Sequence, residues 1–162
     1  MKHLCLTCDA DELKDLIGQK LLRHLSIEPE IAKEREYYDA VCLVIRDLLS
    51  ELKLRTYDDD KAIPQKELFY LSMEFLPGAS LRNHLFNLQL ESEMRGALRA
   101  MGKDLDALYA LDPDAGLGNG GLGRLASCYM DAAASLGMPV HGMSICYEYG
   151  IFKQAIENGR QV

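Results

Sequence analysis

Apolar residues recur at helical spacing through the first third of the chain, with polar residues between them. Asp9 followed by Glu12 is a capping-box pattern, which predicts that a first helix begins there. A second and longer helix is expected over about residues 29–54, where apolar positions alternate three and four residues apart. The acidic run at residues 58–60 is expected to end this second helix.

The middle of the chain combines strand and helix patterns. Residues 66–75 are apolar with alternation, which predicts a strand, and the Pro-Gly pair at residues 77–78 is expected to break it. Helical spacing returns over residues 81–88 and residues 94–102, and a helical turn is expected at residues 105–108. The pattern therefore predicts one strand followed by short helices.

A run of glycines marks the last third of the chain. Residues 114–124 read DAGLGNGGLGR, and they precede an Ala-rich helical pattern that starts near Gly120. The small residues of this helix favour close packing against a sheet, and its end is expected at Gly137, with Pro139 as a stop. A helix that starts in glycines presents free N–H groups and the positive end of its dipole. The run therefore predicts an anion site, most often one for phosphate.

Two further strands are expected after this helix. Residues 140–149 alternate, residues 151–156 form a shorter apolar run, and the Asn-Gly pair at residues 158–159 predicts a hairpin turn. The chain ends at Val162, two or three residues into the returning strand. Because a domain rarely ends on half a hairpin, we expect the chain to be a fragment of a longer protein.

The glycine run also permits two other interpretations. Gly118-x-Gly120-x-x-Gly123 matches the dinucleotide fingerprint, but the residues before it predict a helical turn and a loop, whereas the fingerprint follows a strand. No acidic residue falls at the end of a second strand about 20 residues further on, as ribose binding requires. The run can also be a tight turn that only lets a helix pack closely.

The composition is that of an ordinary globular protein, since 48% of the 162 residues are hydrophobic and 27% are charged. The length suits one domain. The net charge of −7 argues against a nucleic-acid partner, and no apolar run is long enough to cross a bilayer. The N-terminus lacks the apolar core of a signal peptide, so the protein is expected in the cytoplasm.

The five cysteines fit reduced thiols in a cytosol because they are odd in number and scattered. Cys5 and Cys8 form a Cys-x-x-Cys pair, but the sequence has no second pair to complete a zinc site and too few preceding residues for the strand of a redox motif. We therefore expect no metal site.

Four segments resemble the glycogen (starch, maltodextrin) phosphorylase family in their order and spacing. They are DAGLGNGGLGRLA at residues 114–126, YLSMEF at residues 70–75, YEYGIFKQ at residues 147–154, and Tyr38-Asp39-Ala40 with Arg46-Asp47. The resemblance extends from about residue 30 to the end of the chain. Agreement of four such segments in the same order and spacing is very improbable by chance.

This resemblance implies an enzyme that splits α-1,4-glucan with inorganic phosphate and releases glucose 1-phosphate, with pyridoxal 5′-phosphate as cofactor. The implied fold is α/β, with two Rossmann-like domains facing across a cleft in the glycosyltransferase B architecture. Residues 1–162 would be the helix-rich first part of the N-terminal domain. The Schiff-base lysine belongs to the C-terminal domain, outside this chain, so the chain alone is expected to be inactive. The implied partners are glucan and phosphate, with no nucleic acid and no membrane, and the full-length enzyme is expected to be a homodimer.

The resemblance also implies roles for residues of this chain. It implies that the Gly121 backbone N–H, at the same helix N-terminus as Gly120, reaches the substrate phosphate, and that Leu122 contacts the glucosyl unit. Asn119 is expected to be the N-cap that fixes the turn. Glu74 is expected near the catalytic cleft. Without the resemblance, Glu74 is expected to be a strand-end residue bonded to neighbouring backbone.

Other polar residues are expected to be structural. Arg124 is given no catalytic role and is expected to pair with Asp114 or Asp131. The remaining candidates are expected to bridge to backbone or to be packed or surface residues: Asn83, Asn87, His84 and His141.

Three places depart from the family's pattern. Leu76-Pro77 stands where an aromatic residue and a methionine are common, and Ala79 and Cys146 each stand where an arginine is usual. A lost arginine removes a fixed cation and a bidentate donor, so the effect of these changes stays open, as does regulation by a nucleotide. The alternative function is a free-standing phosphate- or nucleotide-binding module, which predicts saturable ligand binding by the isolated chain as a compact monomer.

Overall fold

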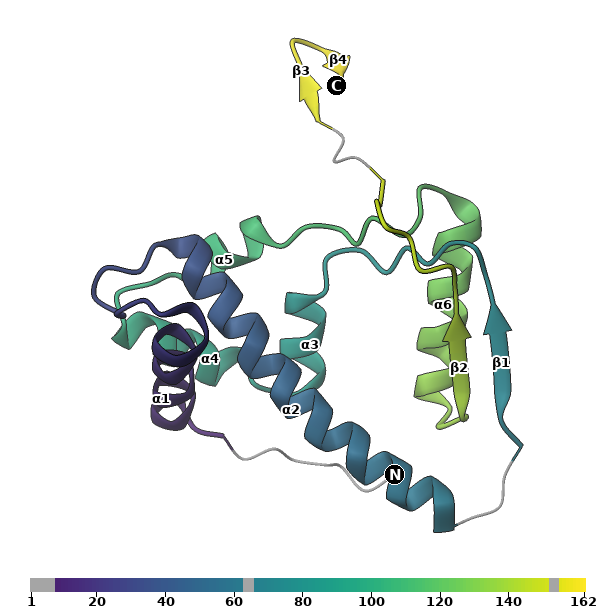
Figure 1. The fold of residues 1–162 in the computed structure, drawn as a ribbon, viewed down its shortest axis with the longest axis horizontal. Helices are drawn as coiled ribbons and strands as arrows, with labels where there is room; N and C mark the ends of the chain where they lie inside the picture. Colours follow the sequence, from purple (N-terminus) through teal and green to yellow (C-terminus); the bar gives the residue numbers. More distant parts are fainter. Residues whose placement is uncertain (1–7, 63–65, 152–154) are drawn as a thin grey trace. The chain divides into compact units, whose positions relative to one another are not determined.

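The structure, a computed structural model, describes residues 8–62, 66–151 and 155–162 (Figure 1). The chain divides into two compact units. Unit 1 contains Met1–Asp59 and Ala79–Asp112, and unit 2 contains Asp60–Gly78 and Pro113–Val162.

Unit 1 is helical. Its elements are α1 (Ala10–Lys20), which continues into a π-helical turn η1 (Leu21–Leu25), then α2 (Glu34–Ala62), α3 (Leu81–Asn87), α4 (Glu91–Ala100) and α5 (Leu105–Leu111). The predicted capping box is confirmed. The Asp9 carboxylate accepts the Glu12 N–H at 2.8 Å, and the Glu12 carboxylate accepts the Asp9 N–H at 3.2 Å.

Helix α2 departs from its predicted bounds at both ends. It begins at Glu34, after a turn at residues 29–31, and the Tyr37 hydroxyl donates to the Pro29 carbonyl at 3.0 Å. It also runs through residues 58–60, so the expected end at the acidic run is wrong. An aspartate costs a helix much less than a proline does, and the first proline after α2 begins is Pro64.

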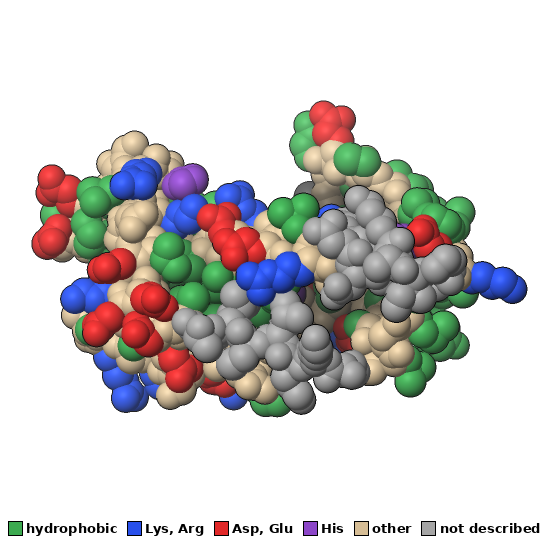
Figure 2. All heavy atoms as spheres, turned by 90° about the horizontal axis from the view of Figure 1, so that it is seen from below, with side chains coloured by type: hydrophobic (Ala, Val, Ile, Leu, Met, Phe, Trp, Pro, Cys, Tyr) green, Lys and Arg blue, Asp and Glu red, His purple; other side chains and the backbone are tan. Residues whose placement is uncertain are grey.

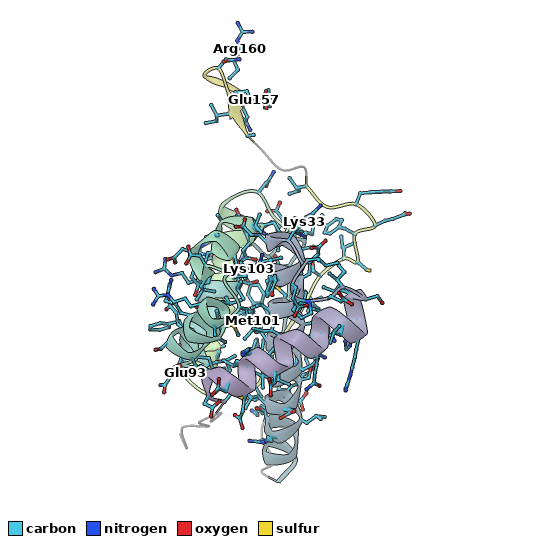
Figure 3. The ribbon with its side chains drawn as sticks, turned by 90° about the vertical axis from the view of Figure 1, so that its left-hand side faces the viewer. Lys33, Glu93, Met101, Lys103, Glu157 and Arg160 are labelled. Carbon is cyan, nitrogen blue, oxygen red and sulfur yellow. The ribbon has the colours of Figure 1, made fainter. Side chains whose placement is uncertain are left out.

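The core of unit 1 is formed where α1, α2 and α4 present their apolar faces to one another. Its fully buried side chains include Leu13, Ile17, Val41, Val44, Met94 and Leu98. Lys103, labelled in Figure 3, donates from Nζ to the carbonyl of Ala32 at 3.0 Å and lies 4.8 Å from the centre of the Tyr37 ring. This contact ties the segment after α4 to the start of α2.

Unit 2 contains the sheet. Strand β1 (Leu68–Leu71) and strand β2 (Val140–Met143) pair in parallel, with Leu68 opposite Val140 and Leu71 opposite Met143. Helix α6 (Gly121–Ser135) lies beside them (Figure 1), and Tyr129 packs edge-on against Tyr70 with ring centres 5.9 Å apart. The helix predicted after the glycine run is confirmed. It is followed by Gly137 in the left-handed region, at φ 64°.

Both strands of this sheet are shorter than predicted. The Ser72 N–H bonds to the Met143 carbonyl at 3.0 Å, which is where the parallel pairing stops. Beyond it, the Ser72 hydroxyl turns the chain by accepting the Glu74 N–H at 3.2 Å, and the Tyr147 hydroxyl donates to the Met73 carbonyl at 2.8 Å. Side-chain hydrogen bonds of Ser72 and Tyr147 thus follow the ladder, and the prediction that residues 72–75 and 144–149 are strand is wrong.

The predicted hairpin is confirmed. Strands β3 (Ile156–Glu157) and β4 (Arg160–Gln161) are antiparallel, and the turn residues Asn158 and Gly159 have φ of 52° and 74°. Glu157 and Arg160 stand opposite each other in the register and are labelled in Figure 3. Of the strand expected at residues 151–156, residues 152–154 lie outside the described part of the chain.

Apolar side chains of unit 2 reach the surface of the molecule (Figure 2). On the β1–β2 sheet, the side chains of Phe69, Leu71 and Met143 are 51%, 75% and 49% exposed. The described residues thus form a helix-rich α/β arrangement with a small parallel sheet, as the fold class predicts at this coarse level.

Candidate functional site

The glycine-rich loop ends at the N-terminus of α6. Gly120 is the N-cap, with an extended backbone (φ −160°, ψ −155°) and no side-chain cap, and the Arg124 N–H closes the first turn on the Gly120 carbonyl at 3.0 Å. Gly120, Gly121 and Leu122 are all exposed. The first N–H groups of a helix have no partner within the helix, so this end of α6 offers donors to an anion.

Asn119 is not the N-cap, so that prediction is wrong. It lies one residue before the cap, and its backbone N–H donates to Oε2 of Glu74 at 3.3 Å. The loop before α6 is fixed by a residue that lies 45 positions away in the sequence, not by its own asparagine side chain. The predicted site residues Asn119, Gly120, Gly121 and Leu122 run from the end of this loop into the first turn of α6, and Glu74 is in contact with the loop.

Glu74 comes from the segment that follows β1. The backbone of this segment is bonded to the loop and to α6, since the Phe75 N–H donates to Leu117 and the Leu76 N–H donates to Gly123, each at 3.0 Å. The Ser72 hydroxyl donates to the Glu74 carbonyl at 2.7 Å. The carboxylate of Glu74 is therefore held at a defined place beside the loop.

Two glycines permit this close contact. A Cβ at Gly123 would lie 3.0 Å from Cβ and 3.2 Å from Oε2 of Glu74, and a Cβ at Gly118 would lie 3.2 Å from Cβ of Leu76. Gly120 and Gly121 are different, because a Cβ at either would have no neighbour within 4 Å. Gly118 and Gly123 thus serve packing, whereas Gly120 and Gly121 leave the mouth of the helix open.

A second backbone contact fixes the start of the loop. The Ile151 N–H donates to the Gly116 carbonyl at 3.0 Å, and a Cβ at Gly150 would lie only 2.8 Å from that carbonyl oxygen. The Ser144 hydroxyl donates to the Met73 carbonyl at 3.3 Å. The glycine-rich loop is therefore held at both of its ends.

The partners predicted for Arg124 are wrong. Its guanidinium donates to the carbonyls of Leu76 and Pro77 at 3.4 Å and 3.2 Å. These contacts are to backbone, so they do not depend on the departures from the family's pattern at residues 76 and 77.

The remaining candidates lie apart from the loop. His141 stacks on Phe69 with ring centres 5.1 Å apart, and its Nε2 is 3.4 Å from Oε2 of Glu67. Asn87 donates to the side chain of Asn83 at 3.3 Å, so these two residues bond to each other, and the expected bridge to backbone is wrong.

No metal site emerges in the part of the chain that the structure describes, where no three His, Cys, Asp or Glu side chains are grouped to hold an ion. Burial raises the pKa of the Cys8 thiol, and Cys5, its predicted Cys-x-x-Cys partner, lies outside the described residues. None of the described helices is both long enough and apolar enough to span a membrane.

Comparison with known proteins decides which family the glycine-rich loop belongs to. The family model described as carbohydrate phosphorylase matches residues 98–162, which include the loop, α6 and β2. The chain is 42% identical over 151 residues to glycogen phosphorylase of Chlamydia pneumoniae, a match that covers 93% of this chain and 18% of that protein. Residues 98–162 therefore match the carbohydrate phosphorylase family. Identity to glycogen phosphorylase of Haemophilus influenzae is 40% (94% and 18% covered), and to the human liver form 41% (93% and 18% covered).

The chain spans about 18% of the length of these relatives. Within this chain, the sequence pattern did not indicate which residues hold the glycine-rich loop in place, namely Ser72, Leu76, Gly118 and Gly123. A partial signal was present, because five glycines fall within residues 116–123.

Proposed function

We propose that this chain is part of an α-1,4-glucan phosphorylase, which releases glucose 1-phosphate from glycogen or maltodextrin with inorganic phosphate. The observation that carries the proposal is the 40–42% identity to glycogen phosphorylases over 93–95% of this chain. The open N-terminus of α6 supports it, because phosphate needs several oriented donors. The enzyme would work in the cytoplasm as a homodimer.

The finer fold assignment belongs to the same proposal. We propose that residues 1–162 form part of an N-terminal domain with a Rossmann-like sheet, in the two-domain glycosyltransferase B architecture. The parallel pairing of β1 and β2 supports this, as does the exposed apolar surface at Phe69, Leu71 and Met143. Parallel sheets are covered on both faces, so further elements of the whole enzyme would cover this surface and extend the sheet.

At the site, the backbone N–H of Gly121 would donate to the substrate phosphate, with Asn119 and Gly120 shaping the approach to it. Leu122, whose side chain is 58% exposed, would contact the glucosyl unit. Neutral backbone donors that are already oriented stabilise charge that develops on the transferred phosphate oxygens. Glu74 would lie at the edge of the catalytic cleft.

The cofactor expected for the family is pyridoxal 5′-phosphate, and the chemistry that it supplies when bound is proton exchange through its phosphate group. Among the described residues, the loop and the start of α6 offer donors to one phosphate group. That group would be the phosphate of the substrate. We place the Schiff-base lysine outside this chain and assign none of its residues to the cofactor. The 162-residue chain alone should therefore release no glucose 1-phosphate, and robust phosphorolysis by it would contradict the proposal.

The proposal is tested in a whole enzyme. This chain would replace the matching segment of the Chlamydia pneumoniae relative, and release of glucose 1-phosphate from glycogen and phosphate would be measured. We expect the chimaera to be active. Gly121→Val should lower kcat/KM by about 100-fold or more, because the side chain would fill the open space in front of the donors.

Gly18→Val is the matched control. Gly18 lies in α1, and a Cβ there also has no neighbour within 4 Å, but it is not part of the glycine-rich loop. The control should retain activity within a few-fold of the parent chimaera. A folded, cofactor-loaded chimaera without activity, or equal losses in both variants, would contradict the proposed function.

A further inference from the structure

One carboxylate lies beside the donors at the mouth of α6. Oε2 of Glu74 is 3.3 Å from the Asn119 nitrogen, and it would lie 3.2 Å from a Cβ placed on Gly123, in the first turn of the helix. The carboxylate therefore stands alongside the first turn but bonds outside it, one residue before the Gly120 cap. The Gly121 and Leu122 N–H groups are left to other acceptors.

The Glu74 carboxylate has little freedom to leave this place. Its own backbone is held by Ser72 through two hydrogen bonds, of 2.7 Å and 3.2 Å. The next two residues are bonded to Leu117 and Gly123. The side chain is half-buried against the loop. A carboxylate beside a helix N-terminus also stabilises the helix through the dipole, which keeps it there when no other anion is present.

We propose that Glu74 is a positioning residue that orders the glycine-rich loop through the Asn119 N–H and sets, through its negative charge, how strongly the mouth of α6 attracts an anion. The ordering keeps residues 118–120 in the conformation that leaves Gly121 and Leu122 open. The charge opposes a second anion a few ångströms away, so the site admits phosphate without holding it tightly. The part of this inference that concerns phosphate rests on the proposed function.

The two effects separate in two variants of the 162-residue chain. Glu74→Gln retains an oxygen that can accept the Asn119 N–H but removes the charge, whereas Glu74→Ala removes both. Exchange of the Asn119 amide with water, measured by NMR without phosphate, should rise by about tenfold in Glu74→Ala and by less than about twofold in Glu74→Gln. Asp114→Asn, which removes an exposed carboxylate at the start of the same loop, is the control and should leave this exchange unchanged.

The second measurement is a titration with inorganic phosphate, followed at the Gly121 and Leu122 amides. Glu74→Gln should bind phosphate about threefold or more tightly than the parent, because a nearby negative charge has gone while the loop stays ordered. A merely structural role for Glu74 would leave the phosphate affinity of Glu74→Gln unchanged, and that result would overturn the electrostatic part of the inference.

The outcomes also distinguish this inference from the proposed function. Unchanged Asn119 exchange in Glu74→Ala would overturn the positioning role whatever phosphate does. Increased exchange in Glu74→Ala, together with no response of the parent chain to phosphate, would support the positioning role and count against the phosphate site.

Discussion

The hydroxyl of Tyr38, in α2, donates a hydrogen bond to Oδ1 of Asp112, directly after α5, at a distance of 2.8 Å. Oδ2 of the same carboxylate accepts the N–H of Leu81, the first residue of α3, also at 2.8 Å. One side chain therefore joins three helices of unit 1. Burial and this hydrogen bond raise the pKa of Tyr38 well above its usual range, so the hydroxyl stays a donor.

Replacing Asp112 should destabilise unit 1 strongly. Asp112→Ala leaves the Tyr38 hydroxyl and the Leu81 N–H without their acceptor, and we expect a loss of about 2–4 kcal/mol in the free energy of unfolding. Tyr38→Phe should cost about 1 kcal/mol, and the double variant should cost less than the sum of the two. Urea denaturation measures all three. A loss of less than about 0.5 kcal/mol in Asp112→Ala would show that the bridge contributes little.

Two glycines of the same loop should respond in opposite ways to an added methyl group. Gly123→Ala places a Cβ 3.0 Å from Cβ of Glu74, and we expect it to destabilise unit 2 by about 1–3 kcal/mol. Gly121→Ala meets open space within a helix and should be neutral or stabilising by less than about 1 kcal/mol. Chemical denaturation followed by near-ultraviolet circular dichroism compares the two. Equal effects would mean that the contact between Glu74 and α6 is not tight.

Alkaline pH should weaken unit 1 through Tyr109. Burial raises the pKa of Tyr109 to about 12, from an ordinary value of 10.0. Because the unfolded chain loses this proton first, the stabilisation is complete below pH 10 and is lost as the pH rises towards 12. Between pH 10 and pH 12, the free energy of unfolding of Tyr109→Phe should fall less than that of the parent. The difference should be about 1 kcal/mol, because solvent screens this partly exposed group.

The matched control for that titration is Tyr149→Phe, because the Tyr149 side chain is 84% exposed. Free energies of unfolding would be compared at pH 9, 10 and 11 for the parent and both variants. An identical decline in the parent and in Tyr109→Phe would contradict the assignment of the alkaline loss to Tyr109.

The apolar surface of the β1–β2 sheet should make the isolated chain self-associate. Leu71→Lys replaces a side chain that is 75% exposed, so it should reduce association and binding of a hydrophobic dye while changing stability by less than about 0.5 kcal/mol. Leu54→Lys, at a 66% exposed position of α2, is the control. Light scattering on the three proteins measures the effect. An equal reduction in both variants would mean that added charge, and not the sheet surface, is responsible.

Elements defined by neighbouring residues could be predicted from the sequence. The capping box at Asp9, the start of α6 near Gly120 and the turn at Asn158 depend on side chains and glycines within a few positions of one another. The helix-rich α/β class follows from the same local patterns.

Features set by distant contacts could not be predicted in this way. The strands stop at Leu71 and Met143, and beyond them the Met73 carbonyl accepts the hydroxyls of Ser144 and Tyr147, which are 71 and 74 positions away in the sequence. Asn119 is a residue type that favours the N-cap, but its N–H bonds to Glu74 and the cap is Gly120, one residue later. The residues around Arg124 in the sequence do not indicate that its side chain bonds to the backbone carbonyls of distant residues.

The contact of Gly116 with Gly150 affects how mutational scans of this protein should be interpreted. A Cβ at either position would meet main-chain atoms, 3.1 Å away at Gly116 and 2.8 Å away at Gly150. Both would score as intolerant in a library selected for activity. Such a score would result from the close packing of two backbone segments. It would not be evidence that either glycine contacts sugar or phosphate.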